Sequence, residues 1–196
     1  MQHIYDESAF DTTVPVGSYW EESGGEPVLC SDLAAEHTVT CDVAIIGAGY
    51  TGLSAAYHMV RDRGAQVRVL EAGTVGWGAS GRNGGFVSDG GSKLAPDALA
   101  KRYGLAETKR FLDWQHSTVE LVSEILETEK IDADKTGRVL IGMAHKANRA
   151  VGLRNYADYA NKTFGTHHRY LDKDQCAEHG IKGPQVFGGR CQRKIA

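Results

Sequence analysis

The first 60 residues contain no lysine and no arginine. All 22 basic side chains follow residue 60, whereas nine acidic residues precede it. Nucleic-acid-binding arms and mitochondrial-type presequences both need positive charge, so this asymmetry argues against either at the N-terminus. We predict no nucleic-acid partner and interpret residues 1–38 as an acidic N-terminal arm.

Long apolar runs are also missing. No run approaches the ~18 residues of a membrane span, and residues 1–36 lack the apolar core behind a positive flank that is typical of a secretory signal. The four cysteines show neither C-x-x-C spacing nor a dense disulfide framework: Cys30, Cys41, Cys176 and Cys191. We therefore predict a cytoplasmic protein with reduced cysteines and no membrane span.

The usual catalytic constellations are absent too. The sequence offers no Ser–His–Asp arrangement, paired-carboxylate site or metal-ligand spacing. His167 and His168 are adjacent, but neighbours on a strand point to opposite faces, which disfavours a shared metal. We predict no metal site, and the catalytic residues are left unassigned.

The clearest pattern that is present runs from residue 41 to residue 71. The segment CDVAII (41–46) is typical of a strand covered on both faces of a parallel sheet. GAGYTG (47–52) follows it, then a helix over 53–63 that Gly64 ends, and a second strand over 66–70. This order predicts a Rossmann-like βαβ unit that binds a dinucleotide.

Each residue of this fingerprint has a physical role. Gly47 permits the tight turn, Gly49 lets the backbone approach a pyrophosphate, and Gly52 lets the helix pack close to the strand. The helix N-terminus offers unpaired N–H groups to the phosphates. Glu71 follows the last glycine at the spacing of an acid that binds the ribose, which disfavours NADP. A purely structural glycine turn is the alternative, and the fingerprint alone does not separate NAD from FAD.

A second glycine cluster, GASGRNGGF (78–86), follows the predicted ADP site. Ser80, Arg82 and Asn83 carry hydrogen-bond donors, while Gly84 and Gly85 let the backbone lie against a flat ring or a phosphate. A Gly-rich linker is the alternative. A simple NAD domain has a helix in this position, so the glycine cluster favours FAD as the cofactor. An NAD-dependent dehydrogenase is therefore the least favoured of the candidate functions.

Residues 41–88 resemble the FAD-binding region of the D-amino-acid oxidase/glycine oxidase superfamily. The segments CDVAIIGAGYTGLSAAYHM and VLEAGTVGWGASGRNGG look most like the branch that contains γ-glutamylputrescine oxidase and related amine oxidoreductases. The SYW at 18–20 is similar to the N-terminal arm of that branch. The resemblance continues more loosely to about Phe187.

The resemblance implies FAD as the cofactor and assigns roles along both glycine segments. Ser80, Gly81 and Arg82 would lie along the pyrophosphate and ribityl chain, and Asn83 with the two following glycines would approach the isoalloxazine. The complete predicted cofactor-binding set is Gly47, Gly49, Tyr50, Thr51, Gly52, Glu71, Ala72, Ser80, Gly81, Arg82, Asn83, Gly84 and Gly85. We expect residues 39–90 to form the FAD-binding unit.

The rest of the chain is predicted to be mixed α/β. Residues 91–136 form a helical segment with helices over 94–103 and 106–130. Trp114 lies on the apolar face of the second helix and is interpreted as a core residue, with a flavin-stacking residue as the alternative. By resemblance, residues 137–187 begin the substrate domain's mixed sheet, with strands over 137–144 and 168–171 and helices over 146–164 and 173–179. Tyr156 and Tyr159 are either substrate contacts or amphipathic packing residues.

The implied activity is oxidation of a primary or secondary amine, such as a γ-glutamylputrescine-like compound, to an imine or aldehyde, with oxygen giving hydrogen peroxide. Family members are longer than this chain, and residues 188–196 are basic without apolar periodicity, so we interpret them as an atypical tail left by an early stop or a frame change. Uncovered strand faces would favour self-association and weak or absent FAD binding and activity. The alternative is a non-catalytic nucleotide-binding module.

Overall fold

The computed structural model describes residues 6–25, 38–137 and 139–193. The chain divides into two compact units, with the boundary between Phe86 and Val87. The first unit contains the 3-10 helix η1 (Glu7–Phe10), helix α1 (Tyr19–Ser23), strand β1 (Val43–Ile46), helix α2 (Tyr50–Arg63) and strand β2 (Val67–Leu70). Both parts of the predicted mixed α/β fold are present, as a parallel and an antiparallel sheet.

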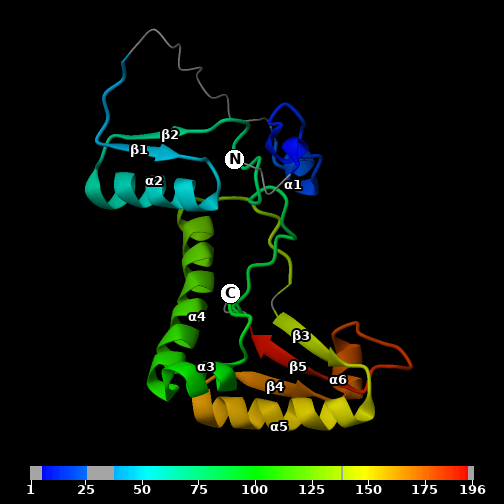
Figure 1. The fold of residues 1–196 in the computed structure, drawn as a ribbon. Coiled ribbons are helices and arrows are strands. Elements are labelled where there is room, and N and C mark those ends of the chain that lie inside the picture. The colour runs from blue at the N-terminus through cyan, green and yellow to red at the C-terminus, as the bar shows by residue number, and fades with distance from the viewer. Residues whose placement is uncertain (1–5, 26–37, 138, 194–196) are drawn as a thin grey trace. The chain divides into compact units, whose positions relative to one another are not determined.

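Strands β1 and β2 are parallel, with Val43 opposite Val67 and Ile46 opposite Leu70. Helix α2 crosses between them and covers one face of the pair (Figure 1). It ends at Gly64, which takes a left-handed conformation with φ 62° and whose N–H donates to the carbonyl of Val60. This βαβ unit matches the sequence prediction, except that α2 begins at Tyr50, so the last residues of the glycine fingerprint form its first turn.

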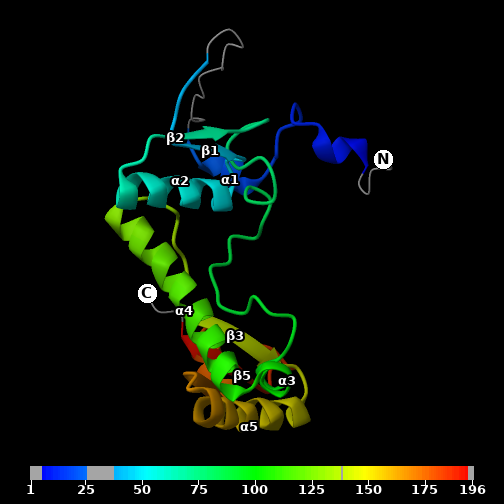
Figure 2. The same ribbon diagram turned by 60° about the vertical axis from the view of Figure 1, so that its left-hand side comes forward.

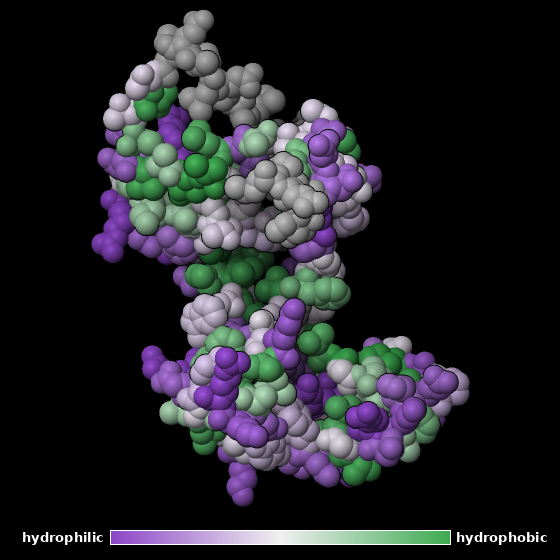
Figure 3. All heavy atoms as spheres, in the orientation of Figure 1, coloured by the Kyte–Doolittle hydropathy of each residue, from purple (hydrophilic) through white to green (hydrophobic). Residues whose placement is uncertain are grey.

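The prediction that the first strand is buried on both faces is wrong within the described residues. Alternate residues of β1 are half-buried, but Ile46 is 90% exposed. Hydrophobic side chains gather over β1 and β2 on the face seen in Figure 3. Ala48 is the one buried hydrophobic residue in the described part of this unit. The unit therefore has little core of its own and leaves an apolar strand face uncovered.

The second unit contains four helices and three strands in its described part. They are α3 (Pro96–Tyr103), α4 (Leu105–Thr128), β3 (Val139–Ala144), α5 (Ala147–Phe164), β4 (His168–Leu171), α6 (Lys173–Glu178) and β5 (Gly188–Arg193). The strands form an antiparallel sheet in the order β3-β5-β4. Helix α5 runs along one face of this sheet (Figures 1 and 2).

Strand β5 lies within residues 188–196, which the sequence analysis interprets as an atypical tail and for which it predicts no strand. Gly188–Arg193 is the central strand of the sheet and pairs with both neighbours. Its inward residues are small: Cys191 packs in the core cluster with Leu171 and Cys176. A Cβ on Gly189 would lie 2.9 Å from Ile141 Cγ2. The strand lacks apolar periodicity because a glycine and a cysteine occupy the positions of its core face.

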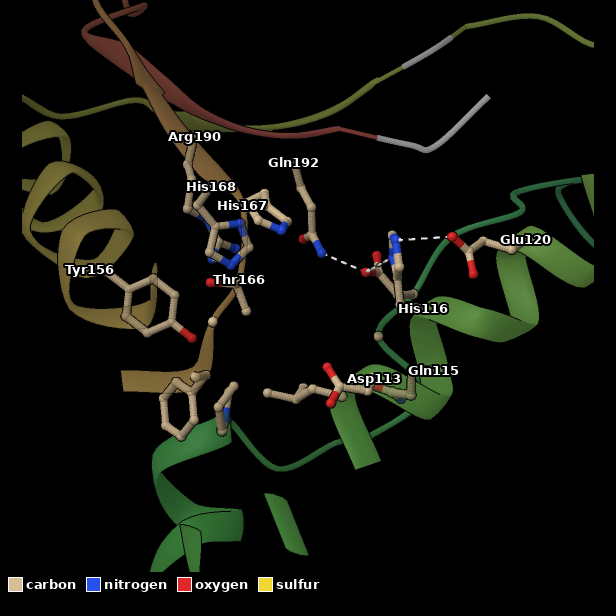
Figure 4. Close-up of a pocket in the computed structure, with 16 residues that line it drawn as sticks. Asp113, Gln115, His116, Glu120, Tyr156, Thr166, His167, His168, Arg190 and Gln192 are labelled. Atoms are coloured by element: carbon tan, nitrogen blue, oxygen red, sulfur yellow. Dashed lines mark hydrogen bonds and ion pairs between the residues drawn. The ribbon is translucent and has the colours of Figure 1, made fainter. Parts of the chain in front are cut away.

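Trp114 is a second correction. The sequence places it in the core of the long helix, but its side chain is 61% exposed. The buried residues of α4 are Thr108, Gln115 and Val119, so the buried stripe is displaced from the predicted apolar face. Gln115 lines a cavity beside the helix (Figure 4), and the buried Thr108 satisfies its hydroxyl by donating to the carbonyl of Gly104 at 2.9 Å.

Candidate FAD-binding site

The turn between β1 and α2 is shaped by its glycines. Gly47 has φ +98°, a left-handed conformation that favours glycine, and its N–H donates to the carbonyl of Leu70 at 2.7 Å. A Cβ on Gly52 would clash with the carbonyl oxygen of Gly47 and approach Ile45 Cγ2 at 3.3 Å. The turn is therefore hydrogen-bonded to the end of β2, and helix α2 packs directly against the turn, as the fingerprint predicts.

The N-terminus of α2 is available to an anion. Gly49 is the N-cap and provides no side-chain cap of its own. The N–H groups of Thr51 and Gly52 have no hydrogen-bond acceptor among the residues that the structure describes. Unpaired N–H groups and the positive end of the helix dipole are the features that bind a pyrophosphate. The turn thus fits the ADP part of a dinucleotide.

Ser80 connects the second glycine cluster to this helix end. Its hydroxyl oxygen accepts a hydrogen bond from the N–H of Tyr50 at 2.9 Å. A Cβ on Gly49 would lie 2.9 Å from the same oxygen. Position 49 therefore needs a glycine because the Ser80 hydroxyl lies so close, apart from any need to admit a phosphate. The two glycine segments, 47–52 and 78–86, meet at this point.

Glu71 binds the turn from the end of β2. Its carboxylate accepts the N–H of Ala48 at 2.6 Å, that of Ala72 at 2.9 Å and that of Gly73 at 3.1 Å. These hydrogen bonds, with Ala48 contributing most, hold the pKa of Glu71 below its usual value despite partial burial. The group is an ionised acceptor at neutral pH. A carboxylate has about four lone-pair sites, so three backbone bonds leave capacity for a ribose hydroxyl.

The segment 76–86 is a hydrogen-bonded turn structure. Gly76 N–H donates to the carbonyl of Ala48 at 3.0 Å, and Gly81 N–H donates to the carbonyl of Gly76 at 2.8 Å. The Asn83 side chain donates to the carbonyl of Ser80 at 2.5 Å and accepts the N–H of Gly85 at 2.7 Å. These bonds disfavour the linker interpretation, because a linker would not satisfy its own backbone groups in this way.

Arg82 does not extend freely from this segment. Its Nε donates to the carbonyl of Trp77 at 2.9 Å, and its guanidinium lies 4.6 Å from the centroid of the Trp77 ring. Gly84 adjoins the Phe86 ring, since a Cβ there would lie 3.1 Å from it. The structure thus brings the glycine turn, Glu71 and Ser80 together. Beyond Ser80, Arg82 contacts Trp77 and Gly84 adjoins Phe86 instead.

The N-terminal arm is hydrogen-bonded to the segment 76–86, and the sequence did not predict this contact. The indole N–H of Trp20 donates to the carbonyl of Asn83 at 2.8 Å, and a Cβ on Gly85 would overlap the Trp20 ring. The indole N–H of Trp77 donates in turn to the carbonyl of Val14 at 2.8 Å. The sequence signal for this contact is the SYW motif at 18–20, which by itself predicts no partner for the indole.

Other groups that the sequence singled out lie in the second unit. Tyr156 lines a cavity there, and the Tyr159 hydroxyl donates to Asp97 at 2.6 Å. No cluster of metal-ligating side chains occurs among residues 6–25, 38–137 and 139–193. Cys41, Cys176 and Cys191 are free thiols, and Cys30 lies outside the described residues. Among the described helices, none combines the length and hydropathy that a membrane crossing requires.

The chain is similar in sequence to known oxidoreductases. The chain is 36% identical to γ-glutamylputrescine oxidoreductase of Escherichia coli over 128 residues, which cover 64% of this chain and 30% of that protein. It is 32% identical to the probable oxidoreductase OrdL of Haemophilus influenzae over 177 residues, covering 89% of this chain and 39% of the relative. The chain thus spans well under half the length of these curated relatives.

Among solved structures, glycine oxidase from Geobacillus kaustophilus superposes with a TM-score of 0.55 at 25% identity, covering 80% of this chain and 40% of that one. The profile of the FAD dependent oxidoreductase family (DAO) matches residues 42–190, which include the glycine turn, Glu71, the second glycine cluster and most of the second unit. The cofactor of this family is FAD, and the open helix N-terminus and the glycine-lined turn fit it. The chain belongs to the DAO family of FAD-dependent oxidoreductases.

Proposed function

We propose that this protein oxidises a primary or secondary amine, with a γ-glutamylputrescine-like compound as the first candidate. The amine would lose two electrons and two protons to give an imine, which water hydrolyses to an aldehyde. Oxygen would take up the two electrons and two protons as hydrogen peroxide. FAD supplies the electron acceptor in this chemistry. The support is the 36% identity to γ-glutamylputrescine oxidoreductase over 128 residues.

The proposed contacts to FAD follow the sequence prediction. Thr51 and Gly52 N–H groups at the start of α2 would bind the pyrophosphate, and Glu71 would bind the adenosine ribose. Ser80, Gly81 and Arg82 would lie along the pyrophosphate and ribityl chain, and Asn83 to Gly85 would adjoin the isoalloxazine. The observation that carries this assignment is the hydrogen bond from Tyr50 N–H to Ser80, which joins the two glycine segments.

A second candidate is a nucleotide-binding module without catalysis. The observation that favours it is the small core of the first unit, where Ile46 is 90% exposed beside the glycine turn. Such a surface favours weak cofactor binding and self-association of the chain. Sedimentation velocity over a concentration series tests the association, and an Ile46→Lys variant should reduce it.

The free thiols also suit a cytoplasmic location, which we include in the proposal.

The two candidates are separated by adding FAD to the purified chain and measuring amine-dependent hydrogen peroxide. A γ-glutamylputrescine-like amine should give peroxide above the level seen with FAD alone, at a low rate because FAD is weakly held. Flavin binding without amine-dependent peroxide would support the nucleotide-binding module. Reduction of NAD by the chain would contradict both candidates.

A further inference from the structure

The N-terminal arm runs alongside residues 73–85, the segment that contains most of the second glycine cluster (Figures 1 and 2). Thr12 and Val16 are half-buried there, whereas the three arm residues between them are exposed. The contacts advance along both segments together: Thr12 adjoins Gly73, Val14 adjoins Trp77, Val16 adjoins Gly81, and Trp20 adjoins Asn83 and Gly85. Residues 12–20 and 73–85 therefore lie side by side in the same direction.

Two of these contacts need a glycine. A Cβ on Gly73 would lie 3.1 Å from Thr12 Cβ, and a Cβ on Gly85 would overlap the Trp20 ring. Gly85 also has φ +69°, a conformation that favours glycine. A side chain at either position would push the arm away, so both glycines admit the arm, apart from any ligand that they admit.

The arm has local structure of its own. The Asp11 carboxylate accepts the N–H of Thr13 at 3.0 Å, and the Glu21 carboxylate accepts the N–H of Gly17 at 2.6 Å. Ser18 caps helix α1 by accepting the N–H of Glu21 at 3.3 Å. Local bonds of this kind reduce the conformational entropy that is lost when the arm docks.

Adjacent residues of the glycine segment face different partners. Ser80 accepts the N–H of Tyr50 at the start of α2, at 2.9 Å. Gly81 adjoins Val16, whose Cγ1 would lie 3.8 Å from a Cβ at that position. Residue 80 is thus bound to the ADP turn, whereas residues 81–85 adjoin the arm. The positions assigned to the isoalloxazine belong to the part that the arm contacts.

We propose that residues 12–20 are part of the flavin site, where they hold residues 83–85 in the position that receives the isoalloxazine. This inference rests on the proposed function, since it needs FAD to lie along both glycine segments. Trp20 is the positioning residue, and it acts through the Asn83 carbonyl and the backbone of Gly85. The arm adds affinity for FAD and none for ADP, because the ADP half of the site is held by Glu71 and Ser80.

The first test measures the Kd of FAD and of ADP for the full chain by calorimetric titration. Trp20→Ala should raise the Kd of FAD at least about fivefold, because a hydrogen bond and ring packing are lost, and should leave the Kd of ADP unchanged. Trp20→Phe keeps an aromatic ring and should recover part of the FAD affinity. Trp114→Ala is the matched control, since that indole is exposed on α4 in the second unit.

A disulfide lock tests whether the arm supports the flavin position or covers it. The double variant Thr12→Cys, Gly73→Cys places two Cβ atoms 3.1 Å apart. A small shift brings the pair to the roughly 3.5–4.5 Å of a disulfide. Peptide mass spectrometry identifies the new bond, and the reduced form of the same variant is the control. We expect the locked form to bind FAD at least as tightly as the reduced form.

The outcomes separate this inference from the proposed function. Equal losses of FAD and ADP affinity in Trp20→Ala, or an unchanged FAD affinity, would overturn the role of the arm and leave the FAD cradle standing. A weaker affinity for FAD in the locked form would show that the arm covers the flavin position, and failure of the two cysteines to pair would contradict the docking. A wild-type chain that binds FAD no more tightly than ADP would instead refute the proposed flavin contacts themselves.

Discussion

At the scale of single residues, Glu71 has two tasks. Its carboxylate holds three backbone N–H groups of the glycine turn, and by proposal it also binds the ribose. The first task needs no ligand, so it can be measured on the chain alone. The hydrogen bonds lower the pKa of this group, which ties the stability of the turn to pH.

The first prediction concerns pH. A carboxyl whose folded pKa is below its unfolded value stabilises the fold above the unfolded pKa, here 4.5, and this contribution is lost as pH falls through the folded pKa. Glu71→Gln should lower the free energy of unfolding at pH 7 by about 1–2 kcal/mol. Below pH 4 the difference from the wild type should shrink. Urea unfolding followed by tryptophan fluorescence at both pH values checks this, and a pH-independent difference would contradict it.

The second prediction concerns Gly49. A Cβ there would meet the Ser80 hydroxyl at 2.9 Å and stand at the start of α2. Gly49→Ala should weaken FAD and ADP binding by about tenfold or more, because the backbone no longer approaches the pyrophosphate closely. Gly78→Ala is the control in the second glycine cluster, since a Cβ there has nothing within 4 Å. Equal losses in the two variants, measured by fluorescence titration, would show that the site is elsewhere.

At the scale of secondary-structure elements, the N-terminal arm emerges as a support for the second glycine cluster. Trp20 and Trp77 each donate an indole N–H across 63 residues of sequence, in opposite directions between arm and loop. Gly85 has φ +69° and adjoins the Trp20 ring. The arm thereby fixes the shape of a loop that, by proposal, adjoins the flavin.

The third prediction follows from this contact. Trp20→Ala should speed amide hydrogen exchange in residues 76–86 at least about fivefold, because one hydrogen bond is worth about 1 kcal/mol and ring packing adds to it. Trp114→Ala is the control, since that side chain is 61% exposed on α4. Trp20→Phe keeps the ring and should show an intermediate effect. Unchanged exchange in Trp20→Ala would mean that the loop holds itself.

The fourth prediction concerns strand β5. A Cβ on Gly189 would lie 2.9 Å from Ile141 Cγ2 and 3.3 Å from Cys176 Sγ. Gly189→Ala should destabilise the second unit by about 1–3 kcal/mol through overpacking. Gly142→Ala on the neighbouring β3 is the control, because a Cβ there meets only the Arg190 carbonyl at 3.9 Å. Thermal unfolding by circular dichroism compares them, and equal midpoints would contradict the packing argument.

The elements differ in how well the sequence predicts them. The βαβ unit was predictable because β-branched runs, glycines at fixed offsets and Glu71 each have one local cause. Strand β5 was not, because its core face consists of Gly189 and Cys191, whose fit depends on partners about 50 residues away in β3. Trp20 was likewise unpredictable as a support, since its acceptor, the Asn83 carbonyl, is set by tertiary structure.

At the scale of the whole molecule, the cofactor fingerprint sits in a unit with a very small core. The residues that line its turn satisfy one another through Ser80 and Glu71, so the cradle does not depend on a large buried surface. The exposed strand face around Ile46 nevertheless limits the stability that the unit provides to a ligand. This balance explains why we expect the chain to bind FAD weakly while keeping the geometry to do so.

The central claim is that residues 47–52 and 76–86 form one FAD cradle. Hydrogen exchange read by mass spectrometry tests it most directly, with the chain alone, with saturating ADP and with saturating FAD. We predict that ADP protects residues 47–52, whereas FAD protects both segments. The account is contradicted if FAD and ADP protect residues 47–52 to the same extent and neither of them changes the exchange of residues 76–86.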